Sequence, residues 1–201
     1  RLPVGSSVAA FVRPRASGGY VVGTERGVAL ADRPHEAPGP ARELWSDPGV
    51  RMNEGATAPD GSLYAGSMAY DARQGAGTLF RIDPEQQVEV ALTDVGVSNG
   101  LGFSPAGDVA YYNDTATGRT DAFTVTGDRL GERHRFVAHD DGAPDGLCVD
   151  SRGNVWVALH GAGTVRCFSP AGALLDEVHV PVRQVTACTL GGPDLRRLYI
   201  T

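Results

Sequence analysis

The stretch SPAGDVAYYND, residues 104–114, joins a polar turn that ends in glycine to an apolar run typical of a β-strand. Similar stretches occur at residues 58–67 (APDGSLYAGS) and 150–159 (DSRGNVWVAL). The turn glycines of the three copies are Gly61, Gly107 and Gly153. Each follows the previous one after 46 residues (107 − 61 and 153 − 107). A repeat of roughly 40–50 residues with several short strands is typical of a four-stranded propeller blade.

Fainter copies of the repeat flank these three. They lie at residues 16–24 and 191–201, and each strong copy is followed by a second strand-like run, at residues 77–84, 120–127 and 163–170. The pattern predicts an all-β protein in which residues 1–201 form a single partial β-propeller domain of roughly four to four and a half blades. A β-sandwich also has many short strands, but it gives no reason for a fixed period.

Composition limits the partners and the compartment. The net charge is −6, so nucleic acid is not an expected partner. No apolar run approaches the roughly 20 residues that a membrane span needs, so no membrane association is expected. The three cysteines, Cys148, Cys167 and Cys188, lie in apolar runs without C-x-x-C spacing. They predict buried free thiols, which are typical of a reducing compartment, and we therefore expect a cytoplasmic protein.

One polar position recurs with the repeat. Eight residues before the three turn glycines stand Asn53, Asn99 and Asp145 (61 − 8, 107 − 8 and 153 − 8). If this position opens the innermost strand of each blade, the three side chains converge at the propeller axis and offer oxygen ligands to a hard cation such as Ca²⁺ or Mg²⁺. Asn-Gly and Asp-Gly are also common turn dipeptides, and a turn would recur at the same period. The spacing leaves both interpretations open.

Four ordered stretches resemble a known family. They are RMNEGATAPDGSLYAGSM (residues 51–68), VSNGLGFSPAGDVAYYNDT (97–115), PDGLCVDSRGNVWVA (144–158) and TACTLGGPDLRRLYIT (186–201). Together they resemble the family of senescence marker protein (regucalcin), gluconolactonase and related lactonases. The resemblance implies a six-bladed β-propeller that binds one divalent cation in its central channel and hydrolyses sugar lactones. Ca²⁺ is the first expectation for the ion, with Zn²⁺ and Mn²⁺ as alternatives.

The resemblance also implies roles for individual residues. Asn99 matches the metal-binding asparagine of the family's S-N-G motif. Asp145 matches the aspartate of P-D-G, which binds the metal and serves as general base or acid. Arg51 and Asn53 resemble the substrate-contacting pair of the R-x-N motif, and Asp71 falls where the family often has an acidic substrate contact.

The sequence departs from the family pattern at both ends. The family's remaining metal ligand is a glutamate in an E-G-P or E-S-P motif, whereas Glu25 is followed by Arg26 and Glu36 by Ala37. By register that glutamate is expected before Arg1, and the last part of the propeller is expected beyond Thr201. The chain is therefore interpreted as an internal portion, about two-thirds of the ring. Open blade edges favour self-association.

We therefore predict a gluconolactonase-type hydrolase in which metal-activated water attacks the carbonyl of a sugar lactone. The alternatives are a non-catalytic propeller that binds Ca²⁺ or another ligand, and an inactive incomplete fragment. No G-x-S-x-G elbow and no H-x-x-x-H pair is present, which excludes the corresponding hydrolase and zinc-protease motifs. His134 and His139 lie in a polar stretch and are expected in an exposed loop.

Overall fold

The computed structural model describes residues 2–201, which form two compact units. Unit 1 ends at Ser98 and unit 2 runs from Asn99 to Thr201. The expectation of one domain over residues 1–201 stays a prediction.

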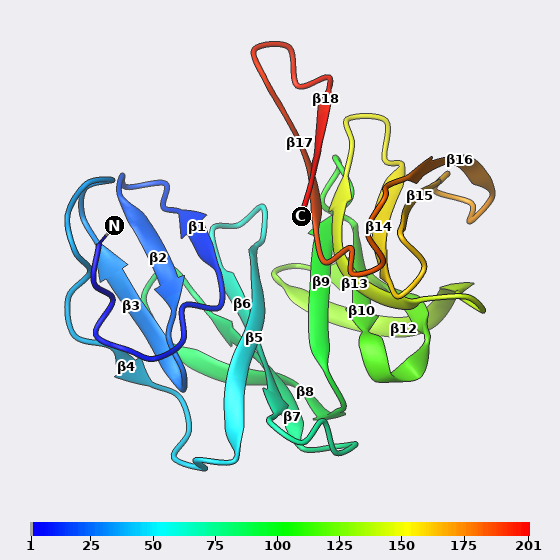
Figure 1. The fold of residues 1–201 in the computed structure, drawn as a ribbon. Helices are drawn as coiled ribbons and strands as arrows, with labels where there is room; N and C mark the ends of the chain where they lie inside the picture. The colour runs from blue at the N-terminus through cyan, green and yellow to red at the C-terminus, as the bar shows by residue number, and fades with distance from the viewer. Residues whose placement is uncertain (1) are drawn as a thin grey trace. The chain divides into compact units, whose positions relative to one another are not determined.

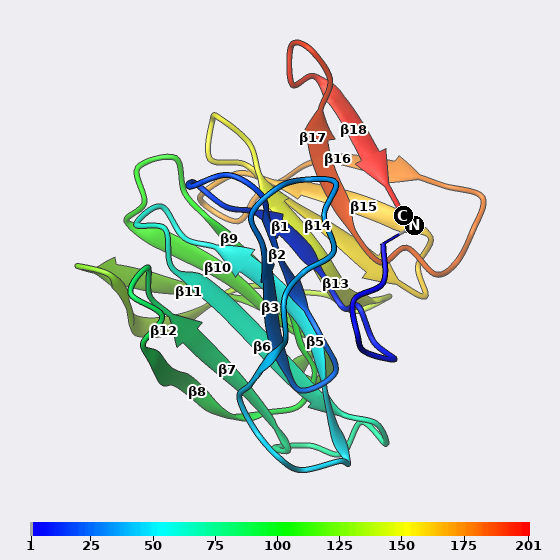
Figure 2. The same ribbon diagram turned by 90° about the vertical axis from the view of Figure 1, so that its left-hand side faces the viewer.

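Unit 1 contains two four-stranded sheets (Figure 1). The strands of the first sheet are β1 (Val12–Pro14), β2 (Tyr20–Gly23), β3 (Gly27–Ala31) and β4 (Arg42–Glu43). The strands of the second sheet are β5 (Val50–Thr57), β6 (Leu63–Ala69), β7 (Gly77–Ile82) and β8 (Val88–Val95). Figure 2 shows β5 to β8 in chain order across their sheet, and neighbouring strands run antiparallel.

Unit 2 contains two further four-stranded sheets and one two-stranded sheet. The strands of the first are β9 (Ser98–Phe103), β10 (Val109–Asp114), β11 (Arg119–Thr126) and β12 (Arg129–Ala138), with a single 3₁₀ turn, η1 (Thr115–Thr117), after β10. The strands of the second are β13 (Ala143–Val149), β14 (Val155–His160), β15 (Thr164–Phe168) and β16 (Leu174–His179). The two-stranded sheet consists of β17 (Cys188–Gly191) and β18 (Arg197–Ile200).

The all-β prediction is confirmed, and the repeat coincides with the sheets. The repeat glycines Gly61, Gly107 and Gly153 lie in the turns that join the first and second strands of three successive sheets, at φ of 90°, 74° and 83°. A side chain is strained at such angles, so glycine is required there. Asn53 and Asp145 consequently lie in first strands, as does Asn99. Closure into a six-bladed ring stays a prediction.

The core of unit 1 is organised around Phe11. Its ring packs with Val21, Val28 and Met52 in one buried cluster. A Cβ atom added at Gly23 would lie 2.4 Å from this ring, and one added at Gly55 would lie 2.5 Å from it. The ring therefore fills the space that two glycines leave open.

In unit 2, the β13–β16 sheet has one apolar cluster on each face. Val155, Val157 and Leu159 pack on one side with Tyr111 of β10. Ala158 and Val165 pack on the other side with Cys188 of β17. This alternation is expected of a strand that is buried on both faces.

The prediction of buried free thiols is confirmed for Cys167 and Cys188 and only in part for Cys148. Cys148, Cys167 and Cys188 are all free, with Cys148 half-buried and the other two buried. Among residues 2–201, no helix has the length and apolar character needed to cross a membrane.

Candidate functional site

Two of the predicted ligands, Asn99 and Asp145, occupy strands whose backbones touch in unit 2. A Cβ atom added at Gly100 would lie 2.5 Å from Leu147 N and 2.7 Å from Asp145 O. One added at Gly146 would lie 2.9 Å from the backbone oxygen of Thr186. Both glycines therefore allow a close approach of backbones that any side chain would prevent.

The turn alternative is wrong for both dipeptides. Gly100 lies within β9 and Gly146 within β13. The hairpin turns in which Asn-Gly and Asp-Gly are common require a positive φ. Neither glycine has one.

Asp145 stands at a β-bulge. Pro144 is opposite Leu159 and Leu147 is opposite Val157, so Asp145 and Gly146 together face one residue of β14. A bulge removes a residue from the regular ladder and redirects its side chain, and bulges are frequent next to active sites.

Asn53 in unit 1 has the equivalent irregularity. In β5, Met52 is opposite Ser67 and Glu54 is opposite Gly66, which leaves Asn53 as the extra residue. Two of the three recurring polar positions are thus bulged.

Side chains from the β10–η1 segment satisfy the carbonyl groups at the Asp145 bulge. Thr115 Oγ1 donates to Pro144 O at 2.8 Å, and Asn113 Nδ2 donates to Asp145 O at 2.6 Å. Asn99 Nδ2 in turn donates to Thr115 Oγ1 at 3.0 Å. Asn99 is only 7% exposed, and this bond uses the nitrogen of its amide, so the amide oxygen is the end available to a ligand.

The predicted substrate pair lies together in unit 1. Arg51 Nη1 donates to Asn53 Oδ1 and to Met52 O, both at 2.9 Å. Asn53 Nδ2 donates to Ser98 O at 2.8 Å. The Arg51 guanidinium also lies 5.9 Å from the centre of the Tyr70 ring, within the range of a cation–π interaction. Arg51 is therefore held by neighbours of its own unit.

Asp71, the fifth predicted residue, is engaged elsewhere. It lies in the exposed turn after β6, and its carboxylate forms an ion pair with Arg73 at 3.1 Å. Hydrogen bonds from the Arg73 backbone N–H and guanidinium lower the pKa of Asp71. The neighbouring Tyr70 hydroxyl donates to Glu25 Oε1 at 2.6 Å, and this bond raises the pKa of Tyr70.

The donor set of unit 2 fits a hard cation. Amide and carboxylate oxygens are the ligands that Ca²⁺ prefers, and Asn99 and Asp145 offer one of each. Among residues 2–201, no group of three or more His, Cys, Asp or Glu side chains is arranged to hold a metal ion. Of the two predicted ligands in unit 2, Asp145 carries a carboxylate and Asn99 a neutral amide oxygen.

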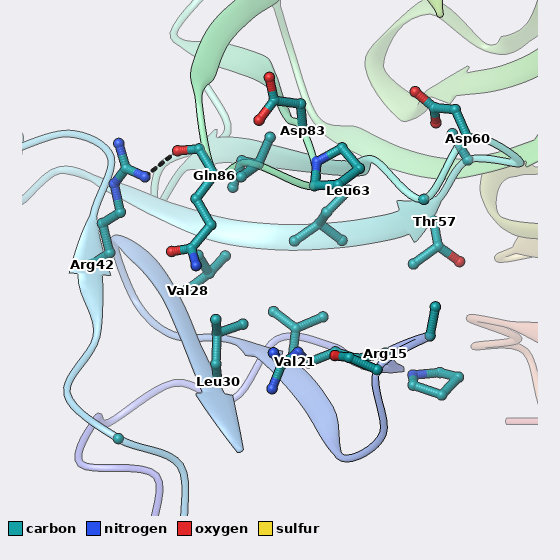
Figure 3. A pocket seen from close by; sticks show the side chains of 18 of the residues that line it. Arg15, Val21, Val28, Leu30, Arg42, Thr57, Asp60, Leu63, Asp83 and Gln86 are labelled. Carbon is teal, nitrogen blue, oxygen red and sulfur yellow. Dashed lines mark hydrogen bonds between the residues drawn. The ribbon is translucent and has the colours of Figure 1, made fainter. Parts of the chain in front are cut away.

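A cavity of about 860 Å³ in unit 1 is separate from these residues. It lies between the two sheets of the unit, and Figure 3 shows Val21 and Leu30 pointing toward Leu63 across it. Its lining includes Thr57, the last residue of β5, whereas Arg51 stands near the beginning of that strand. The cavity is therefore at the opposite end of β5 from the predicted substrate pair.

The sequence prediction missed the polar side chains that support the site, and it misplaced one histidine. Asn113 and Thr115 follow the buried Tyr-Tyr pair of β10. Polar residues at the end of a buried strand are the sequence signal that could have identified them. His134 is exposed as predicted, but it lies in strand β12 and not in a loop. His139 is only 7% exposed, so the exposed-loop prediction is wrong for its burial. Its polar neighbours in sequence concealed its burial.

Known proteins resemble this chain over nearly its whole length. The family model for the SMP-30/gluconolactonase/LRE-like region matches residues 2–201. A 6-deoxy-6-sulfogluconolactonase from Pseudomonas putida is 36% identical over 195 residues, which are 93% of this chain and 66% of that protein. A regucalcin from Danio rerio is 32% identical over 197 residues, which are 94% of this chain and 67% of that protein.

A solved structure of similar fold is a calcium-binding protein, regucalcin, from Agrobacterium tumefaciens. It superposes with a TM-score of 0.87 at 28% identity, over 94% of this chain and 66% of that one. The chain thus spans about two-thirds of the length of the relatives that it matches.

Proposed function

The chain belongs to the SMP-30/gluconolactonase/LRE-like family, and we propose that it acts as a metal-dependent hydrolase that opens sugar lactones. Lactone hydrolysis is represented among its relatives, such as the 6-deoxy-6-sulfogluconolactonase. The observation that supports this function most directly is the contact of the Asn99–Gly100 and Asp145–Gly146 backbones, with Asp145 at a bulge.

Asn99 and Asp145 would hold one divalent cation through an amide oxygen and a carboxylate. We assign Ca²⁺ as the first candidate, since the ligands are oxygens and the regucalcin of similar structure is a calcium-binding protein. Zn²⁺ and Mn²⁺ are the alternatives. When bound, such a cation polarises a lactone carbonyl as a Lewis acid and lowers the pKa of a coordinated water.

The remaining roles belong to side chains. The Asp145 carboxylate accepts the proton of the attacking water and returns it to the ring oxygen when the ester C–O bond breaks, so the product is a hydroxy acid. The Arg51 guanidinium donates to substrate oxygens, and the bond from Arg51 to Asn53 fixes the orientation of that amide. Asp71 is assigned a contact to substrate hydroxyls from the exposed turn.

The test is hydrolysis of δ-gluconolactone followed with a pH indicator, with and without chelator. We expect chelation to abolish turnover and Ca²⁺ to restore it. Asp145→Asn should lose at least about a hundredfold in kcat, the range typical of a general base. Asp176→Asn, which changes an exposed aspartate of β16, is the matched control and should behave as the unmodified chain. Turnover that survives both chelation and Asp145→Asn would refute the proposal.

A second candidate is cation binding without catalysis; the cation binding is suggested by the regucalcin of similar structure, which is a calcium-binding protein. In that case calorimetry should detect Ca²⁺ binding to the unmodified chain and no binding to Asp145→Asn. Neither protein should hydrolyse the lactone with any metal ion.

A further inference from the structure

A series of hydrogen bonds crosses unit 2 and ends on the backbone of Asp145. Asn113 in β10 donates from Nδ2 to Asp145 O at 2.6 Å. Thr120 in β11, which is directly opposite Asn113 in the ladder, bonds through Oγ1 to Asn113 Oδ1 at 2.7 Å. His139, the residue after β12, bonds through Nε2 to Thr120 Oγ1 at 2.9 Å. The series therefore runs from the end of β12 to β13 of the next sheet.

Only one direction of donation satisfies all three bonds. The Asn113 amide nitrogen is used on Asp145 O, so its oxygen faces Thr120 and can only accept. The single hydroxyl proton of Thr120 therefore points to Asn113, and His139 must donate from Nε2. His139 Nδ1 is then the ring nitrogen with the lone pair. This atom is buried, and it has no hydrogen-bond partner among residues 2–201.

The three side chains occupy positions where an apolar residue would be expected. Asn113 and Thr120 are completely buried, and the His139 ring packs edge-on against Phe168 at 5.7 Å between ring centres. The hydrogen bonds of buried polar groups add little net stability, because they largely offset the cost of removing those groups from water. What this series provides is a donor for the Asp145 carbonyl, which the bulge removes from the regular ladder.

We propose that Asn113, Thr120 and His139 are positioning residues that hold the Asp145 peptide and thereby aim its carboxylate at the reacting groups. The role of the carboxylate rests on the proposed function, whereas the restraint of the peptide does not. Catalytic groups must be held to about 0.5 Å, and a displacement of about 1 Å can cost a hundredfold in rate.

The decisive variant is Thr120→Val, which removes the hydroxyl shared by two of the bonds and keeps the shape of the side chain. Thr120→Ser retains the hydroxyl. Thr164→Val is the matched control, because Thr164 is only 3% exposed and its buried hydroxyl has no partner in the described part of the chain. Each variant is assayed for kcat and KM on δ-gluconolactone, for Ca²⁺ affinity by calorimetry, and for the ¹³C shift of the Asp145 backbone carbonyl.

We expect Thr120→Val to lower kcat by about ten- to a hundredfold with KM nearly unchanged, to shift the Asp145 carbonyl resonance, and to weaken Ca²⁺ binding. Thr120→Ser should restore all three values, and Thr164→Val should alter none. An unshifted carbonyl in Thr120→Val, or equal losses in Thr120→Val and Thr164→Val, would overturn the positioning role.

The two proposals fail in different ways. Full turnover in Asp145→Asn would overturn the catalytic assignment, and the carbonyl shift and Ca²⁺ affinity would still decide whether Thr120 restrains the peptide. An inactive Asp145→Asn beside a fully active Thr120→Val would overturn the positioning role alone.

Discussion

At the scale of single residues, His139 is a base in surroundings that oppose its protonation. Burial and then the charge of Arg166 lower the pKa of His139 from 6.5 to about 4, although Asp141 and Asp140 act in the opposite direction. The unfolded state therefore binds more protons than the folded state between these two pH values. The stabilisation is complete above about pH 6.5 and is lost as the pH falls toward 4.

We expect this loss to reach about 3 kcal/mol by pH 4, since one pKa unit corresponds to about 1.4 kcal/mol. His139→Asn removes the titrating ring, so its free energy of unfolding should depend less steeply on pH in this window. Urea unfolding at pH 7, 5.5 and 4.5 measures the slope. His134→Gln, at an exposed histidine, is the control and should keep the slope of the unmodified chain. Identical slopes in both variants would contradict the assignment.

The three thiols should differ in reactivity. The Cys148 and Cys188 thiols interact with each other, and this interaction lowers the pKa of Cys148 and raises that of Cys188. Burial raises the pKa of Cys167 to about 11. Thiolates are the reactive species, so at pH 8 one thiol, Cys148, should react first with a disulfide reagent that releases a coloured product. Cys148→Ser should remove the fast phase and Cys167→Ser should retain it. A fast phase that follows Cys167 would contradict this order.

At the scale of elements, the contact between β9 and β13 is the restraint most easily tested. Gly100→Ala would place a methyl group 2.5 Å from Leu147 N, and a backbone atom has little freedom to move away. We expect a loss of about 1–3 kcal/mol in the free energy of unfolding, as for other overpacked sites, together with weaker Ca²⁺ binding.

Gly39→Ala is the control for this change, because the nearest atom to its added methyl group is 3.8 Å away. Chemical denaturation of both variants provides the comparison. If Gly100→Ala unfolds at the denaturant concentration of Gly39→Ala, the two strands are not in close contact in solution.

The elements were largely predictable from the repeat, because turn chemistry is local. Gly61, Gly107 and Gly153 have positive φ in their turns. Glycine adopts such angles without steric cost because it has no side chain, so these turns can be recognised from the residue type alone. The bulge at Asp145 was not predictable. Asp145–Gly146 has the residue types of a turn, yet its glycine is required by the backbone of Thr186 and Ala187, which precedes β17 and is distant in sequence.

The candidate site shows the same division. The family resemblance singled out Asn99 and Asp145, and the structure brings their backbones together. The resemblance could not reveal the support from Asn113 and Thr120, because their polar atoms face each other only after β10 and β11 pair. His139 was misjudged because Asp140 and Asp141 beside it are polar, while its own ring turns inward.

At the scale of the whole molecule, unpaired strand edges are the feature with a direct physical outcome. In the described chain β18 pairs only with β17, and its Tyr199 is 50% exposed. Such edges can pair with another copy, so we expect concentration-dependent association of this 201-residue chain in sedimentation velocity.

Tyr199→Lys should reduce this association, since a charge on an edge strand discourages pairing. Leu195→Lys changes a more exposed residue in the adjoining turn, 68% exposed, and should leave association unchanged. A chain that stays monomeric at all concentrations would contradict the expectation.

The Phe11 ring, enclosed by Gly23 and Gly55, has a consequence for how related sequences can diverge. The three positions share one fixed volume, so an ancestor could not have gained a methyl group at either glycine while the ring remained. Substitutions at positions 11, 23 and 55 must therefore occur together, with a smaller residue at position 11 wherever position 23 or 55 carries a side chain. An alignment of related sequences should therefore show covariation among these three positions, which are separated in the chain.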